Sequence, residues 1–125
     1  MTEYEYLDLI STYRAETGFH VMNFIAAMFA YIAAGYFVGE KLSRFQVTAI
    51  TVLYTMFAPL PVSAGYEALQ ATRSTHLAYV AAFGPPDYPS TLVLFGPELA
   101  LVVVGLSWVI SIIFMFQTRI ARAKS

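Results

Sequence analysis

The chain contains no cysteine and very little charge. The absence of cysteine excludes disulfides, thiolate metal sites and cysteine nucleophiles. Charged residues make up 12% of the 125 residues, whereas an ordinary soluble domain carries about 25%. A small domain has much surface for its volume, so this little charge cannot cover a water-soluble globule. The composition therefore excludes a soluble enzyme, and 58% hydrophobic residues indicate one membrane-embedded domain, 1–125.

The chain also lacks the features that would indicate nucleic-acid binding or catalysis. Seven Lys and Arg against eight Asp and Glu give a net charge of −1, which provides no field to attract phosphates. There is no glycine-rich phosphate loop, no G-x-S-x-G and no H-E-x-x-H motif. The two histidines, His20 and His76, lack the ligand pattern of a haem or zinc site. We therefore expect a protein that is not an enzyme and has no metal, cofactor or nucleic-acid partner.

Three charge-poor stretches are long enough to cross a membrane. A spanning helix needs about 20 mostly apolar residues. The stretches predict helices at about 17–39, 44–66 and 91–118. The sequence therefore predicts an all-α membrane protein with three transmembrane helices.

The segments outside the spans are of two kinds. In the first 16 residues, four apolar side chains recur at helical spacing: Tyr4, Leu7, Ile10 and Tyr13. This pattern predicts a short N-terminal helix that lies at the membrane interface. Residues 67–90 are expected to connect the second and third spans. Within this connector, 67–83 either extends the second helix or lies at the interface, and the three prolines of 84–90 stop any helix.

The orientation follows from the basic residues in the short loops. Five of the seven lie in the link between the first two spans or in the C-terminal tail: Lys41, Arg44, Arg119, Arg122 and Lys124. Arg14 and Arg73 lie on the other side. This asymmetry predicts that the N-terminus is outside and the C-terminus inside, as in a bacterial inner membrane.

The first span carries a face of polar and then small residues. Their spacing of three and four keeps them on one line of the helix: Glu16, His20, Asn23, Ala27, Ala30 and Ala34. Gly35 and Gly39 add a G-x-x-x-G motif at the inner end. Small faces allow close packing of helices in lipid. We therefore expect this face to pack against another helix.

The third span carries small residues on two sides, with Gly105 on one and Ser107 and Ser111 on the other. Two packing sides predict contact with a second chain as well, either a homo-oligomer or other membrane subunits. The alternative is that both serines bond to carbonyls of their own helix.

The second span combines hydroxyl groups with prolines. Thr48, Thr51 and Thr55 share one face, and Pro59 and Pro61 follow. Each proline removes a backbone donor and predicts a kink. The carbonyls that lose their donors must be satisfied in the membrane, either by hydroxyl groups or in a polar cavity.

Glu98 is the strongest candidate for a functional residue. It lies several residues into the third span, in the outer half of the membrane, where a charged side chain is costly. One interpretation is a hydrogen bond to His20 or Asn23, and the other is a proton or cation site.

Two functions remain open on this evidence. In the first, an oligomer forms a pore or transport component whose polar path is lined by side chains of several copies: Glu98, His20, Asn23, Glu16, Thr48, Thr51 and Thr55. In the second, the chain is a structural or accessory subunit and the same groups bond between helices. A third possibility is an assembly that disrupts membranes.

Overall fold

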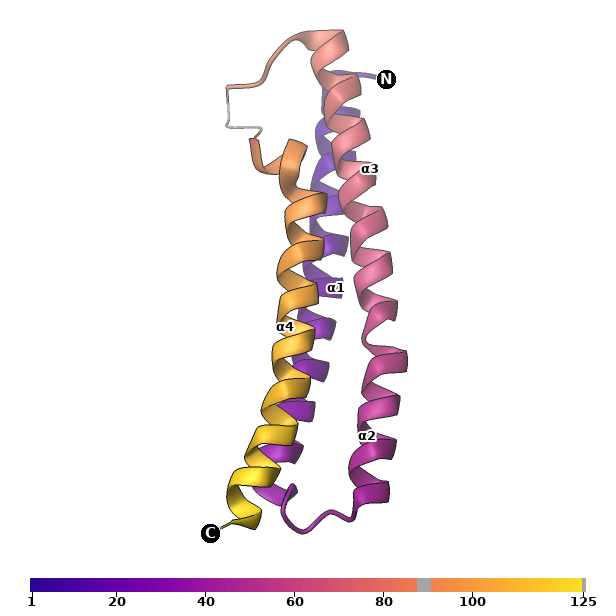
Figure 1. The fold of residues 1–125 in the computed structure, drawn as a ribbon. Helices are drawn as coiled ribbons and strands as arrows, with labels where there is room; N and C mark the ends of the chain where they lie inside the picture. Colours follow the sequence, from indigo (N-terminus) through magenta and orange to yellow (C-terminus); the bar gives the residue numbers. More distant parts are fainter. Residues whose placement is uncertain (88–90, 125) are drawn as a thin grey trace.

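The computed structural model describes residues 1–87 and 91–124, and within these ranges it contains helices and no strand (Figure 1). The helices are α1 (Glu3–Val38), α2 (Arg44–Phe57), α3 (Pro59–Phe83) and α4 (Thr91–Ala123). Because α3 follows α2 after a single residue, the pair acts as one long rod. Three rods are long and apolar enough to cross a membrane: α1, α2 with α3, and α4. The predictions of an all-helical chain and of three such helices are confirmed.

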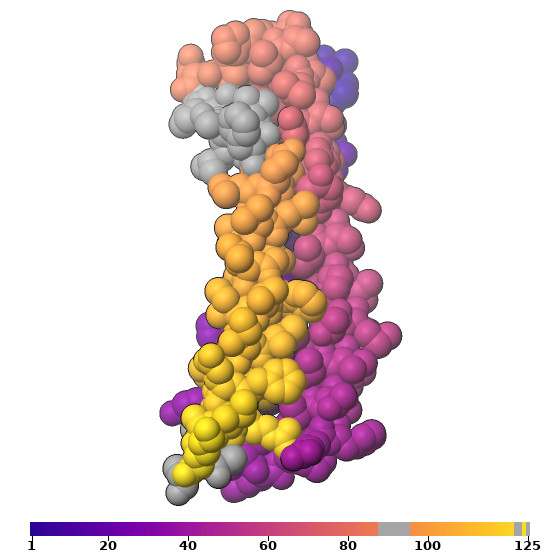
Figure 2. Space-filling view, viewed as in Figure 1, coloured from indigo at the N-terminus to yellow at the C-terminus, as the bar shows by residue number. Residues whose placement is uncertain are grey.

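The chain passes along the length of the bundle three times. α1 and α4 run in one direction and α2–α3 runs in the opposite direction, so the two termini lie at opposite ends (Figure 1). Figure 2 shows α4 lying along α2 and α3, while α3 extends beyond α4 at the end that holds the N-terminus. This end is called the N-terminal end below.

The N-terminal residues do not form a separate short helix. Residues 3–16 are the first turns of α1, which continues without a break to Val38. The stretch around Arg14 contains no proline, and the Thr17 hydroxyl donates to the Tyr13 carbonyl along the same helix. The glycine at 18 costs only about 1 kcal/mol in a helix interior, which does not stop a helix of this length.

The start of α1 is fixed by a capping box. The Thr2 side chain accepts from the Glu5 backbone N–H, and the Thr2 backbone N–H donates to the Glu5 carboxylate. This backbone hydrogen bond holds the pKa of Glu5 below its usual value, because it favours the charged carboxylate. Ser43 and Gln46 form the same motif at the start of α2, as their S-x-x-Q spacing indicates.

α3 reaches further than the predicted second span. The helix is interrupted at Ala58, directly before Pro59, and then continues to Phe83. Of the two alternatives for residues 67–83, the structure has the helical extension. Gly84 ends α3 with a φ of 88°, a backbone conformation that favours glycine. The rest of the predicted connector, 88–90, lies outside the described residues.

The extra turns of α1 and α3 form a two-helix extension, here called the outer arm (residues 3–16 and 67–83). With 36 residues, α1 is about 54 Å long, whereas the hydrocarbon core of a bilayer is about 30 Å thick. Thr72, His76 and Tyr79 of α3 are buried in the arm, and the Tyr79 hydroxyl donates to the Glu3 carboxylate at 2.9 Å. Thr72 and His76 therefore lie on the buried side of a helix pair, whereas Glu67 and Ser74 are exposed.

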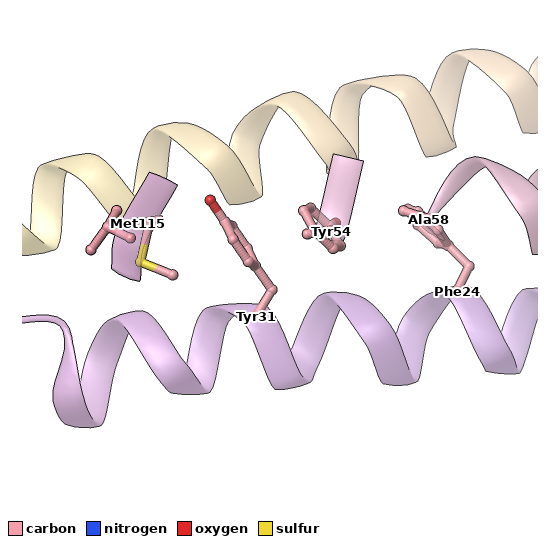
Figure 3. Close-up of a cluster of buried hydrophobic side chains, with 6 residues drawn as sticks. Phe24, Tyr31, Tyr54, Ala58 and Met115 are labelled. Carbon is pink, nitrogen blue, oxygen red and sulfur yellow. The ribbon is translucent and has the colours of Figure 1, made fainter. Parts of the chain in front are cut away.

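The apolar core lies in the opposite half of the bundle. It joins α1, α2 and α4 through six buried side chains: Phe24, Tyr31, Val47, Tyr54, Ala58 and Met115 (Figure 3). Met115 is fully buried, at 0% exposure. This core fixes the three spans relative to one another, and the polar groups of the spans are arranged around it.

Candidate functional site: the polar groups of the spans

The centre of the bundle is a stacked pair of tyrosines. The rings of Tyr31 and Tyr54 lie 4.2 Å apart and only 10° from parallel. The Tyr31 hydroxyl bonds to the Thr51 hydroxyl at 2.9 Å, and the Tyr54 hydroxyl bonds to the Ser111 hydroxyl at 3.0 Å. These two bonds and the stack link α1, α2 and α4, and they satisfy phenol groups that would be costly to leave unpaired in hydrocarbon.

Other hydroxyl groups of the spans bond to their own helices. Thr48 donates to the Arg44 carbonyl at 2.9 Å, and Ser107 donates to the Val103 carbonyl at 2.8 Å. Ser111 also donates to its own helix, at the Trp108 carbonyl. The threonine face predicted on the second span is therefore divided, because Thr51 turns to Tyr31 while Thr48 is exposed. Within one chain these hydroxyls do not line a common path.

Glu98 pairs with Arg73 of α3, and not with His20 or Asn23 as the sequence suggested. The Arg73 guanidinium lies 2.8 Å from the Glu98 carboxylate, and the two side chains are 35% and 59% exposed. α3 and α4 are antiparallel (Figure 1), and side chains lean toward the N-terminus of their own helix. Glu98 therefore reaches toward the N-terminal end while Arg73 reaches back from the outer arm. The pair neutralises the carboxylate at this edge of the apolar zone.

The face predicted on α1 follows two grooves between α1 and the α2–α3 rod. The first groove, of about 300 Å³, includes Glu16 and His20 of α1 and Glu67 of α3. The second, of about 410 Å³, is apolar and opens where α2 diverges from α1 below the break at Ala58. It is lined on the α1 side by three small residues, Ala27, Ala30 and Ala34. We call the two grooves together the α1 groove.

Asn23 lies between the two halves of the α1 groove along the same helical face. Its side chain is exposed, and within residues 1–87 and 91–124 its amide has no hydrogen-bond partner. The position is seven residues inside the last charge of α1, Glu16, or about 10 Å along the helix. If α1 spans a membrane, an exposed amide at this position faces lipid in a single chain, although it can form several hydrogen bonds.

The glycines of the predicted packing faces have different surroundings. Gly35 is buried, and a Cβ there would lie 2.7 Å from the Met115 sulfur of α4. Gly39 closes α1 by donating its N–H to the Gly35 carbonyl. Gly105 on α4 is exposed, and a Cβ there would meet no atom within 4 Å. The close approach marked by Gly35 is therefore a contact within the chain, between α1 and α4.

The sequence contains no indication of a cavity that lies beside Trp108 in the structure. It has a volume of about 210 Å³ and lies between the α2–α3 break and α4. The indole Nε1 of Trp108 is buried and has no hydrogen-bond partner among the described residues. A smaller cavity of about 40 Å³ shares its Phe24 wall and continues toward His20. The sequence could not predict this cavity, because the residues that surround Trp108 are brought there by the break between α2 and α3.

Neither metal-ligand geometry nor comparison with known proteins assigns a function to these groups. Among the described residues, no group of three or more His, Asp or Glu side chains is placed to hold a metal ion. Comparisons of the chain with protein-family models, with curated proteins and with solved structures give no match. The polar groups of the spans and the α1 groove are therefore the basis for a functional proposal.

Proposed function

We propose that the protein is a non-catalytic membrane subunit that assembles with a second membrane helix through the α1 groove. The partner is a second copy of this chain or another membrane subunit. The observation that carries the proposal is the exposed, unpartnered amide of Asn23 between the two halves of the groove. Polar side chains in the membrane associate helices because hydrogen bonds to a neighbouring helix replace contact with lipid.

The shape of the groove supports the same conclusion. Ala27, Ala30 and Ala34 present little side chain, so the backbone of another helix can approach α1 closely. The polar residues nearer the N-terminal end would then meet polar groups of the partner. By contrast, the hydroxyls around Tyr31 and Tyr54 are already bonded within the chain and offer nothing to a partner. The association site is thus separate from the groups that hold the three spans together.

Replacing Asn23 by leucine is the direct test of this proposal. We expect Asn23→Leu to weaken association by about 1 kcal/mol, or roughly fivefold in the association constant, because one interhelical hydrogen bond is lost. The matched control is Met22→Leu, which alters a neighbouring exposed side chain, 64% exposed, without removing a polar group. Association is measured by energy transfer between labelled chains in liposomes at several protein-to-lipid ratios. Equal association of both variants and the wild type would contradict the proposal.

A pore or transport component is the second candidate. Glu16, His20 and Asn23 lie along one face of α1, and several copies that joined through this face would bring three polar side chains per chain to a shared axis. Glu98 contributes less to such a path than the sequence suggested, since Arg73 neutralises it. Ion flux from liposomes that contain the wild type would favour this function over a purely structural one. Asn23→Leu should then reduce the conductance of each oligomer, and the flux should fall in proportion.

The proposed orientation places the outer arm outside a bacterial inner membrane and the C-terminus inside. Seven of the eight acidic residues lie toward the N-terminal end, with Glu40 as the exception, and five of the seven basic residues lie at the opposite end. At that end Arg119 also donates to the Leu42 carbonyl at 3.4 Å. Basic residues are retained on the cytoplasmic side. We therefore expect cysteines introduced at Thr2 and Lys124 to react with an impermeant thiol reagent from opposite sides, and reaction of both from one side would refute the orientation.

A further inference from the structure

The end of the bundle opposite the N-terminal end carries an excess of positive charge, and it is called the basic end below. It holds five of the seven basic residues of the chain and one of the eight acidic residues, Glu40. In the part of the chain that the structure describes, Lys41, Arg44 and Arg119 form no ion pair. Their charges are therefore available to an anion from outside the chain.

These three basic residues are brought together from two segments that are remote in the sequence. Lys41 and Arg44 lie in the link between α1 and α2 and at the start of α2, and Arg119 lies in the last turns of α4 (Figure 1). The Arg119 guanidinium donates to the Leu42 carbonyl at 3.4 Å, so it lies against this link. A guanidinium has five N–H donors, and this bond uses one of them. Because Lys41 and Arg44 are exposed, the group is open to an approaching anion.

The start of α2 adds to the positive field at this place. A helix N-terminus carries a partial positive charge, which favours acidic side chains in the first turn. The first turn of α2 contains no acidic residue and begins with Arg44 instead. No side chain of this turn therefore compensates the helix dipole, and a bound anion would supply the negative charge.

The basic end also lies where the apolar spans meet the membrane surface. The charge-poor stretches that contain α1 and α4 end at Glu40 and Arg119. Phe45, directly after Arg44, is 79% exposed, and Phe37 in the last turn of α1 is 71% exposed. Basic groups beside exposed apolar side chains match a ligand that has an anionic head and hydrocarbon tails. A free phosphate ion would use only the first of these two features.

We propose that Lys41, Arg44 and Arg119 bind the phosphate group of an anionic phospholipid, whose acyl chains lie along the exposed apolar side chains of the spans. Clusters of about four to eight basic residues directly beyond a spanning helix are typical of sites for anionic lipid head groups. In the orientation proposed above, this lipid belongs to the cytoplasmic leaflet. The bound phosphate would connect the α1–α2 link to the end of α4.

Native mass spectrometry of the protein in a non-ionic detergent counts the bound lipids directly. We expect dioleoylphosphatidylglycerol, which is anionic, to bind roughly tenfold or more tightly than dioleoylphosphatidylcholine, which has no net charge. Arg44→Gln should weaken binding of the anionic lipid by about fivefold and leave binding of the other lipid unchanged. The matched control is Arg14→Gln, which makes the same change of charge in the outer arm. It should bind both lipids as the wild type does.

Three outcomes of this titration would overturn the proposal. Equal affinity of the wild type for the two lipids would show that the phosphate site does not distinguish a net charge. Equal weakening by Arg14→Gln and Arg44→Gln would indicate attraction by the whole chain and no local site. Soluble glycerophosphoglycerol has the same head group without acyl chains, and a tenfold excess over lipid should not displace the anionic lipid. Displacement would show that the site takes a free phosphate ester.

A thermal comparison in nanodiscs tests the same site in a bilayer. We expect the wild type to melt at a higher temperature in phosphatidylglycerol than in phosphatidylcholine, because the bound lipid joins two segments of the chain. This difference should shrink in the double variant Lys41→Gln/Arg44→Gln. Each variant is compared with itself in two lipids, so its own stability cancels. A difference that is the same in the wild type and the double variant would refute the proposal.

The lipid site and the association site can be tested separately. Asn23 lies 15 residues before the end of α1 at Val38, or about 22 Å along the helix. Asn23→Leu should therefore leave the preference for the anionic lipid unchanged, and Arg44→Gln should leave association unchanged.

Discussion

Replacement of Tyr54 by alanine should destabilise the chain strongly, by about 3–5 kcal/mol, the range found for large aromatic residues in protein cores. Tyr54 is 7% exposed, stacks on Tyr31 and bonds to Ser111. Removing the ring therefore removes the contact that holds α2 against α1 and α4, where the helices otherwise diverge along the apolar part of the α1 groove. The free energy of unfolding in mixed detergent micelles, titrated with a denaturing detergent, measures this effect.

Two controls separate the ring from its hydroxyl. Tyr54→Phe keeps the stack and loses one hydrogen bond, and the Ser111 hydroxyl keeps its bond to the Trp108 carbonyl. We expect a loss of about 1 kcal/mol or less for this variant. Phe45→Ala removes an aromatic ring from the same helix at a position that is 79% exposed, and it should change stability little. A Tyr54→Ala variant as stable as Phe45→Ala would show that the tyrosine pair does not hold the spans together.

The sequence predicts the spans because charge and hydropathy are local properties. The windows between Glu16 and Glu40 and between Glu98 and Arg119 each mark a helix in the structure. The capping residue Ser43 similarly predicts the start of α2. The sequence left two alternatives for residues 67–83, a helical extension and an interfacial segment, because these residues are too polar for a span. They become a helix by pairing with the start of α1, which is remote in the chain.

The pairing of polar side chains could not be predicted from the same information. The sequence placed Glu98 in the third span, but its partner depends on the length of α3 and on the direction in which Arg73 leans. Tyr31 and Tyr54 are 23 positions apart, and nothing in either span distinguishes them from other aromatic residues. Their stack follows from the register of two antiparallel helices. A register of this kind is a tertiary property, and hydropathy does not contain it.

Gly35 gives the second large expected effect, at the contact between α1 and α4. A Cβ at this position would lie 2.7 Å from the Met115 sulfur and 3.2 Å from its terminal methyl carbon. Met115 is fully buried, so its side chain can shift only slightly without disturbing the core. We therefore expect Gly35→Leu to destabilise the chain by about 3 kcal/mol, at the upper end of the usual cost of overpacking. Gly35→Ala should cost less, because the methionine side chain can shift by rotation.

A matched glycine and a compensating change make this expectation specific. Gly18 lies in the same helix, and a Cβ there would meet no atom within 4 Å, so Gly18→Ala should be neutral or should stabilise the helix by up to about 1 kcal/mol. Met115→Ala should rescue Gly35→Leu, because it removes the atoms that clash, and the two changes are then non-additive. Unfolding free energies of the single and double variants measure this coupling. If the double variant were destabilised by the sum of its single changes, Gly35 and Met115 would not be in contact, and the close crossing of α1 and α4 would be refuted.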